Sequence, residues 1–340
     1  MSLEPHDPTV PTTLPRDAEP AVEVAEFYAP PPVAHRNGGA ARRDPSFRDR
    51  RQLSIVLFLV TSVCVFLVGM IPGGALRGVW LQAVWLFQLG VLRPDWPEML
   101  TNGFVFCGCL MGILLAHEMG HYLQAVRHRV PATWPFFIPF PISPFGTMGA
   151  VILQDGRRAD RRQMFDIAIS GPLAGLVLAI PITWYGVSIS AVDVVSPNPT
   201  SIHYGNPLLL DWIVGWIHRP MAANEDILLN APLFAGWVGL FITGLNLLPV
   251  GQLDGGHILY MLIGRRAHYV AYGVMGLAIA WMAYSRRFEF ALIFVLLMLM
   301  GPKHPPTADD RAPLGIGRIL LGWLTLAFII VGFTPTPILM

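Results

Sequence analysis

Two histidines and a glutamate interrupt a long apolar run that begins near Phe104. The stretch from Leu115 to His121 reads LAHEMGH. Ionisable side chains are expensive to bury in hydrocarbon, and within a membrane span they are a functional-site hypothesis by default. The fold must therefore place these three side chains where protein groups or a bound ion satisfy them.

The composition is that of a membrane protein. Hydrophobic residues make up 54% of the chain and charged residues only 13%, which lies outside the usual range of soluble domains. The formal net charge of +1, with no basic stripe apart from the flanks of apolar segments, argues against a nucleic-acid partner. Cys64, Cys107 and Cys109 lie in apolar segments and show no metal-type CxxC spacing.

The chain divides into a tail and one membrane unit. Residues 1–50 predict a disordered, Pro-rich cytoplasmic tail with a basic end, and residues 51–340 predict one membrane domain. We expect an all-α polytopic membrane protein with about six transmembrane helices. The first apolar segment begins after residue 51, and a later one starts near 231. The others lie at about 102–126, 164–187, 267–284, 288–300 and 314–333. Segment 79–92 is apolar but short, and its status stays open.

Arginines indicate the orientation of these spans. They cluster after the second span, at positions 127, 129, 157, 158, 161 and 162, whereas the polar stretch from Ser188 to Asn230 has a single arginine. Positive flanks stay inside, so HEMGH lies near the cytoplasmic end of its span. The span that starts near 231 is broken by NLLPVGQLDGGH, from Asn246 to His257, because its proline and glycines unwind a helix.

HEMGH has the spacing of a zinc hydrolase site. Residues four apart project from one face of a helix, so His117 and His121 can bind one Zn²⁺ ion while Glu118 lies beside it. Zinc lowers the pKa of its bound water to roughly 7, and Glu118 can take that proton and pass it to the leaving amine. The alternative is a set of buried polar residues hydrogen-bonded to neighbouring helices.

The broken span supplies candidates for the rest of the site. Asp254 is the best third metal ligand, although an aspartate also suits the N-cap of the helix that begins after Gly255. Asn246 could point its amide at the developing oxyanion, or make an interhelical hydrogen bond. The residues alone leave both choices open.

A substrate strand is expected between the second and third spans. The segment WPFFIPFPISPFGTMGAVILQDG reads as a membrane-associated loop followed by a short strand or hairpin. Its residues Gly146, Thr147, Met148, Gly149 and Ala150 could hold a substrate chain in extended form through main-chain hydrogen bonds. The alternative is a loop that packs on its own protein.

HEMGH, GPLAG at Gly171 to Gly175 and NLLPVGQLDGG, in that order over about 102–264, resemble the site-2 protease family of intramembrane zinc metalloproteases, peptidase family M50. The segment after this core looks like that of bacterial members close to the plant chloroplast homologues. The resemblance implies that residues 51–340 form an intramembrane metalloprotease domain with its catalytic core at about 102–264. It implies that His117, His121 and Asp254 bind zinc and that Glu118 is the catalytic acid/base. It also implies a role for Asn246 near the reacting carbonyl, and a substrate that is a membrane protein with a transmembrane helix in the lipid bilayer.

The chain departs from the family pattern in three places. The loop at 188–230 is too short for a PDZ domain, nothing after Gly264 looks like a CBS pair, and Gly175 stands where many members have Asn. The expected location is the cell membrane, as a multi-pass protein with the tail and the active site toward the cytoplasm; the absence of a transit peptide favours a bacterial plasma membrane.

Two rival functions stay in view. One is a membrane zinc protease that trims C-termini and takes a glutamate as third ligand, for which only Glu225 and Glu289 follow HEMGH. The other is a catalytically silent membrane scaffold or chaperone with the same fold, which has no need of Glu118.

Overall fold

Helices dominate the computed structural model, which describes residues 50–70, 96–194, 203–222, 224–286, 291–301, 306–334 and 338–339. All of these belong to one unit of the chain, Asp44–Met340. The expected tail, apart from its last residue, and the segment 79–92 lie outside the described residues.

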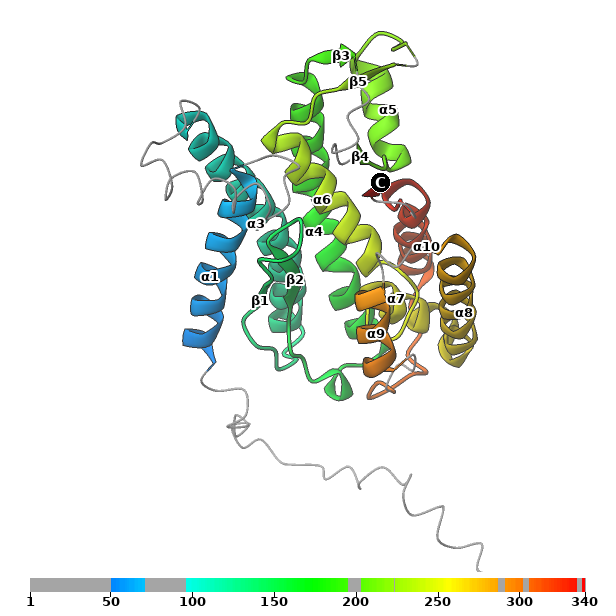
Figure 1. Cartoon of the computed structure of the whole chain (residues 1–340). Coiled ribbons are helices and arrows are strands. Elements are labelled where there is room, and N and C mark those ends of the chain that lie inside the picture. The colour runs from blue at the N-terminus through cyan, green and yellow to red at the C-terminus, as the bar shows by residue number, and fades with distance from the viewer. Residues whose placement is uncertain are drawn as a thin grey trace, which may run out of the picture. The chain divides into compact units, whose positions relative to one another are not determined.

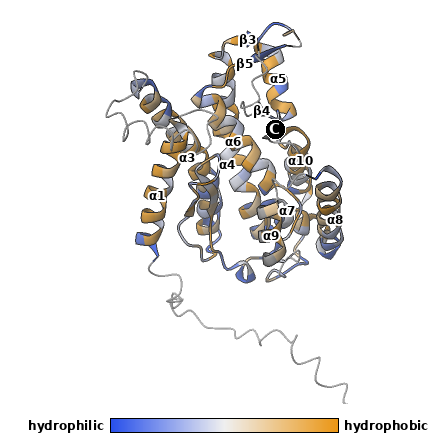
Figure 2. Ribbon diagram, viewed as in Figure 1, coloured by the Kyte–Doolittle hydropathy of each residue, from blue (hydrophilic) through white to orange (hydrophobic). Residues whose placement is uncertain are grey.

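Three helices in this part of the chain are long and apolar enough to cross a membrane. They are α1 (Arg51–Gly69), α3 (Trp96–Arg127) and α4 (Arg161–Ser188). Shorter apolar helices are α5 (Leu208–Ile217), α6 (Ala231–Asn246) and α10 (Ile316–Gly332). Apolar residues run along α1 and α6 in Figure 2. A mostly helical fold with three candidate membrane spans in the described residues is thus confirmed, while the count of about six spans stays a prediction.

The remaining helices lie toward the C-terminal end. They are α7 (Asp254–Ile263), α8 (Ala267–Ser285) and α9 (Ala291–Met300), with 3₁₀ turns at Gly156–Arg158 and Gly264–Arg266. Within the bundle, α4 packs between α3 and α6 and also contacts α7, and α10 lies beside α6 and α7 (Figure 1).

Local capping explains where two of these helices begin. The Asp160 side chain accepts a hydrogen bond from the Gln163 backbone N–H, and the Asp160 backbone N–H donates one to the Gln163 side-chain oxygen, which starts α4 with a capping box. The side chain of Asn230 caps α6 by accepting from the Leu233 N–H. These capping bonds therefore define the first residues of α4 and α6.

A hairpin connects α3 to α4, as expected. Strand β1 (Phe136–Pro139) pairs antiparallel with β2 (Thr147–Val151). The Phe-rich stretch expected to be loop contributes the first strand, because Phe136 and Phe137 bury their rings against the bundle. β1 lies against α1 and β2 lies near α3 (Figure 1).

The stretch from Ser188 to Asn230 is more structured than its polarity suggests. Besides α5, its described residues form β3 (Val192–Val194) paired with β5 (Glu225–Ile227), and β4 (His203–Tyr204) paired with β6 (Ile338–Leu339). α5 forms because Leu210, Ile213 and Val214 share one face and bury it in the core around α6. This helix was not identified from the sequence.

Aromatic stacking joins α3 to α6 at the core. The rings of Phe106 and Phe234 stack with centroids 5.0 Å apart, and those of Trp237 and Phe241 stack at 5.4 Å. A second apolar cluster joins α4, α7 and α10. The helices that carry the polar residues of HEMGH and of the broken span are packed between these two apolar clusters.

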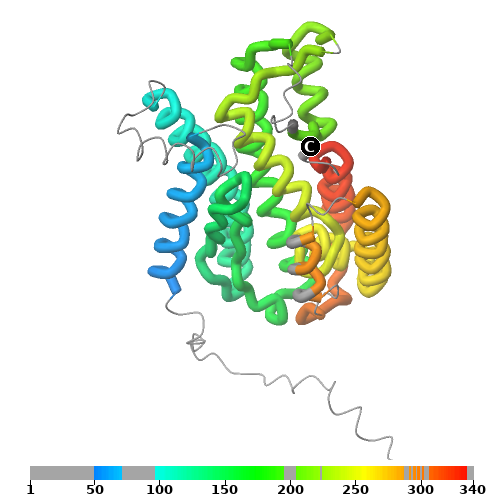
Figure 3. The backbone as a smooth tube through the Cα atoms, viewed as in Figure 1, coloured from blue at the N-terminus to red at the C-terminus, as the bar shows by residue number. Residues whose placement is uncertain are grey.

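The predicted break in the fourth span is present. α6 ends at Asn246 and α7 begins at Asp254, and Figure 3 follows the chain from the yellow-green helix into the yellow one. Gly251 has φ +56°, and a Cβ on Gly255 would lie 1.8 Å from the Leu247 carbonyl oxygen. Glycine thus lets the connecting segment fold back onto the start of α7.

Candidate metal and catalytic site

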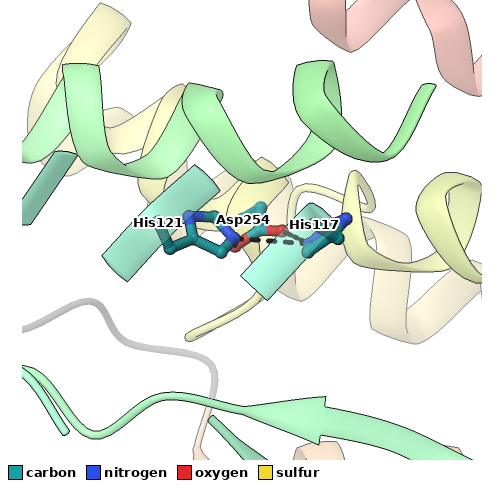
Figure 4. A group of neighbouring side chains, drawn as sticks. All are labelled: His117, His121 and Asp254. Atoms are coloured by element: carbon teal, nitrogen blue, oxygen red, sulfur yellow. Dashed lines mark hydrogen bonds and ion pairs between the residues drawn. The ribbon is translucent and has the colours of Figure 1, made fainter. Parts of the chain in front are cut away.

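Three side chains from two helices meet inside the bundle. His117 and His121 project from one face of α3, and Asp254 comes from the first turn of α7. Figure 4 shows the Asp254 carboxylate between the two imidazole rings. His117 and His121 are 3% and 9% exposed, so water does not satisfy their nitrogens.

The spacing of the ligand atoms fits one tetrahedral ion. The Nε2 atoms of His117 and His121 lie 3.3 Å apart, and the Asp254 oxygens lie 3.0 Å and 3.2 Å from them. Ligands about 2.0–2.1 Å from a tetrahedral zinc sit about 3.3 Å from one another. Within the described residues, this is the group of His, Cys, Asp and Glu side chains that could hold a metal.

A main-chain carbonyl sets the tautomer of His121. Its Nδ1 lies 2.7 Å from the carbonyl oxygen of Ile167 on α4, and a carbonyl only accepts, so Nδ1 carries the proton. The Nε2 lone pair of the neutral ring therefore points at the cluster, as a metal ligand requires. Sequence analysis did not identify this contact, because a backbone oxygen leaves no residue-type signal.

Glycines of α4 make room for the two rings. A Cβ on Gly171 would lie 2.0 Å from His121 Nε2, and one on Gly175 would lie 3.2 Å from His117 Nδ1. The GPLAG pattern predicted close helix contact, and the contact is with the two histidines themselves. One signal was available in the sequence, since the glycines and the histidines share a spacing of four residues.

Asp254 is turned toward the histidines. Leu253 is the N-cap residue of α7 and makes no side-chain capping bond, while Asp254 is the first helical residue. Its two carboxylate oxygens lie against the two His Nε2 atoms. The structure thus brings Asp254 into the cluster, at the place where a third ligand is expected.

Glu118 lies beside the cluster without forming part of it. Its side chain is buried, with 5% exposure, and it is close enough to His117, His121 and Asp254 to interact with them electrostatically. A carboxylate next to a metal-ligand set, and not itself needed as a ligand, is placed to move a proton.

Asn246 reaches the same place from the end of α6. Its amide Nδ2 lies 3.4 Å from His117 Nε2, so the residue contacts the cluster and also links α6 to α3. Both readings of Asn246, oxyanion donor and interhelical hydrogen bond, agree with this position.

The five candidate substrate-binding residues lie in β2 and in the turn before it. Gly146 packs against α1, where a Cβ would lie 2.8 Å from the Cys64 backbone, and its N–H and C=O bond within the turn. The Gly149 N–H donates to Thr147 Oγ1. Met148 and Ala150 are half-buried, and β2 has one sheet neighbour within the described residues, so its other edge carries no strand there.

Of the two glutamates that the rival C-terminus-trimming protease could use, the one that the structure describes does not join the histidines. Glu225 lies in β5 and forms a two-pronged ion pair with Arg219 at 2.7 Å and 2.9 Å. Glu289 lies outside the described residues. The third side chain at the histidine pair is an aspartate.

Comparisons with known proteins identify a family for this chain. The profile of peptidase family M50 matches residues 105–282, just over half of the chain, and the matched part contains HEMGH and both halves of the broken span. Similar proteins include the probable zinc metalloprotease EGY1, chloroplastic, of Oryza sativa subsp. japonica, which is 35% identical over 62% of this chain and 36% of that protein. The Arabidopsis thaliana EGY1 is 31% identical over 66% of this chain and 42% of its own length, and the EGY2 of the same plant 27% identical over 77% and 47%.

The chain thus spans less than half the length of these relatives. The predicted resemblance to peptidase family M50 is confirmed by the family match, and the relatives are named as probable zinc metalloproteases. A helical membrane bundle, a His–His–Asp cluster in it and a family profile that covers both agree: this chain belongs to peptidase family M50.

Proposed function

We propose that this protein is an intramembrane zinc endopeptidase that hydrolyses peptide bonds in or near transmembrane segments of membrane-protein substrates. The observation that carries the proposal is the set of three ligand atoms, all within 4.8 Å of one another, with a buried glutamate beside them. The catalytically silent scaffold is less favoured, because it gives no reason to keep Glu118 buried at the cluster.

His117, His121 and Asp254 would hold the ion, leaving a fourth position open. Zinc in such a site supplies Lewis acidity, which polarises the scissile carbonyl and acidifies water. Glu118 takes a proton from the attacking water and delivers it to the amine that leaves when the C–N bond breaks. Ile167 keeps His121 in the tautomer that presents Nε2.

Asn246 would act on the carbonyl oxygen of the scissile bond. In this structure the amide Nδ2 lies 3.4 Å from His117 Nε2, whose lone pair would bind the metal. When that lone pair is used for the metal, the amide keeps a free N–H at the edge of the site. A donor there can stabilise negative charge as it develops on the substrate oxygen.

The hairpin would hold the substrate as an extended strand. A helical substrate hides its peptide bonds, so part of it must unwind before hydrolysis. The edge of β2 that carries no strand in the described part of the chain can pair with such a segment, and β2 lies near α3, which carries Glu118. Met148 and Ala150 then carry the contacts, since Gly146 and Gly149 use their N–H groups within the hairpin.

Charge asymmetry supports a cytoplasmic active site. The side where α3 ends and α4 begins carries Arg127, Arg129, Arg157, Arg158, Arg161 and Arg162. The connection between α4 and α6 carries one arginine, Arg219, against Asp193, Asp211, Glu225 and Asp226. By the positive-inside rule the first side faces the cytoplasm of a cell membrane.

The test is cleavage of a single-span membrane protein by the purified full chain, comparing the unchanged protein with Glu118→Gln. Glu98→Gln is the matched control, because Glu98 lies on the same helix and is exposed. We expect zinc in all three proteins and cleavage by all except Glu118→Gln. Equal cleavage by Glu118→Gln, or zinc binding without cleavage by the unchanged protein on a panel of such substrates, would refute the proposal and favour the scaffold.

A further inference from the structure

A charged contact joins α4, α10 and the residue after the end of α3, just beyond the metal cluster. The Asp166 carboxylate on α4 accepts two hydrogen bonds from Arg318 of α10, Nε to Oδ1 at 2.7 Å and Nη2 to Oδ2 at 2.9 Å. His128, which directly follows α3, contacts the same carboxylate, Nε2 to Oδ2 at 3.2 Å. Neither the metal site nor the hydrolysis described above uses any of these three side chains.

The next residue along α4 touches the metal site. The Ile167 carbonyl is the acceptor for His121 Nδ1 at 2.7 Å. Two consecutive residues of α4, Asp166 and Ile167, thus contact His128, directly after the end of α3, and His121 within α3, which are seven residues, or about 10 Å, apart. Two contacts separated in this way fix how far α4 is shifted along α3, which one contact alone would not.

The metal site tolerates little movement of α4. Gly171 approaches the His121 ring so closely that even a methyl group would lie 2.0 Å from Nε2. A shift of α4 therefore either presses on the ring or lengthens the bond from Nδ1 to Ile167. Metal ligands must stay within about 0.5 Å of their productive geometry.

Arg318 brings α10 into this arrangement. Four residues further along α10, Gly322 packs on Phe165, where a Cβ would lie 2.8 Å from the ring. The Asp166 side chain is only 16% exposed, so without Arg318 it would be a largely buried carboxylate with His128 as its remaining partner. A buried carboxylate of this kind either becomes hydrated or changes its position. Either change shifts the turn of α4 that holds His121.

We infer that Asp166, held by Arg318 of α10, is a positioning residue for the metal ligand His121. It acts through the register of α4 on α3, and it contacts neither the metal nor the substrate. The inference rests on the proposed function, because it presumes a metal at His117, His121 and Asp254.

The experiment measures the metal site directly in the full-length chain. Asp166→Asn, Arg318→Gln and Arg318→Lys are compared for the zinc dissociation constant, by competition with a chelating dye, and for the visible spectrum of the Co²⁺-loaded protein. Outer partners of ligating histidines change metal affinity about 10–100-fold. We expect zinc binding about tenfold weaker and altered Co²⁺ bands in Asp166→Asn and Arg318→Gln, with partial rescue in Arg318→Lys, which keeps the charge but not the two-pronged geometry.

Arg219→Gln is the matched control, because Arg219 and Glu225 form a similar two-pronged pair away from α3 and α4. It should leave zinc affinity and the Co²⁺ spectrum unchanged. Variants that unfold at lower temperature but keep both metal readouts would overturn the inference and leave the proposed function standing. Absence of zinc binding by the unchanged protein would overturn both. If Asp166→Asn does not fold, the two Arg318 variants decide.

Discussion

The glycines of α4 offer a graded test of the metal site. A Cβ at Gly171 would lie 2.0 Å from His121 Nε2 and 2.4 Å from two other ring atoms, and one at Gly175 would lie 3.2 Å from His117 Nδ1. On α3, a Cβ at Gly112 meets nothing within 4 Å. Single alanine substitutions at these three positions place the same methyl group at three different distances from its nearest neighbours.

The size of the effect follows from these distances. Cβ contacts below 3.0 Å essentially do not occur, so Gly171→Ala forces a displacement of at least about 1 Å between the methyl group and the ring. The ring cannot simply turn away, because Ile167 holds its Nδ1. Since the ligand geometry tolerates about 0.5 Å, we expect zinc binding to weaken about 100-fold or more. Gly175→Ala needs a few tenths of an ångström and should cost less than tenfold.

The assay is zinc affinity by competition with a chelating dye, with circular dichroism as the check on helix content. Gly112→Ala should bind zinc like the unchanged protein, because alanine favours a helix over glycine and meets no neighbour. If Gly171→Ala binds zinc as tightly as Gly112→Ala, then His121 does not lie against α4 as described. An equal loss in all three variants would mean that the effect is general destabilisation.

Three other predictions concern the substrate and the scaffold. Two Ala→Gly substitutions beside the cleavage site of a substrate weaken the substrate helix by about 2 kcal/mol. If the substrate unwinds before hydrolysis, they should raise the cleavage rate about tenfold or more at unchanged zinc content. An unchanged rate would argue against strand binding. Gly146→Ala should lower the free energy of unfolding by about 2 kcal/mol or more, seen as a lower thermal midpoint, because Gly146 has φ +78° and packs on the α1 backbone. Hydrogen bonds from Arg219 and from the Ala222 N–H lower the pKa of Glu225 from 4.5 to about 2, so their stabilisation is present above pH 4.5 and is lost as the pH falls from 4.5 to 2. The exchange rates of the β5 amides, each divided by the intrinsic rate at the same pH, should rise as the pH falls through that window. Arg219→Gln should remove much of this rise.

Local sequence signals predicted the candidate ligands His117 and His121 and the break between α6 and α7. HEMGH places two histidines on one face of whatever helix carries it, and Pro249 with the following glycines predicts an interruption. What brings Asp254 to these histidines is the packing of α7 on α4, which is a contact between distant segments. The sequence alone therefore indicated Asp254 as a candidate, and the structure places it at the cluster.

The remaining features depend on non-local contacts. α5 was not predicted, because its apolar segment is short and lies among polar residues. The Ile167 carbonyl and the Asp166–Arg318 contact could not be predicted either, since Asp166 and Arg318 are 152 positions apart. GPLAG was recognised as a close-packing pattern, but its partners, the two histidine rings, became evident only from the geometry.

The central claim is that His117, His121 and Asp254 together hold one catalytic zinc ion. The most direct measurement is the zinc content of the purified full chain beside that of Asp254→Ala. We expect about one zinc per unchanged chain and a large loss in the variant at equal helix content. A zinc-free unchanged chain, or full retention of zinc by Asp254→Ala, would contradict the account.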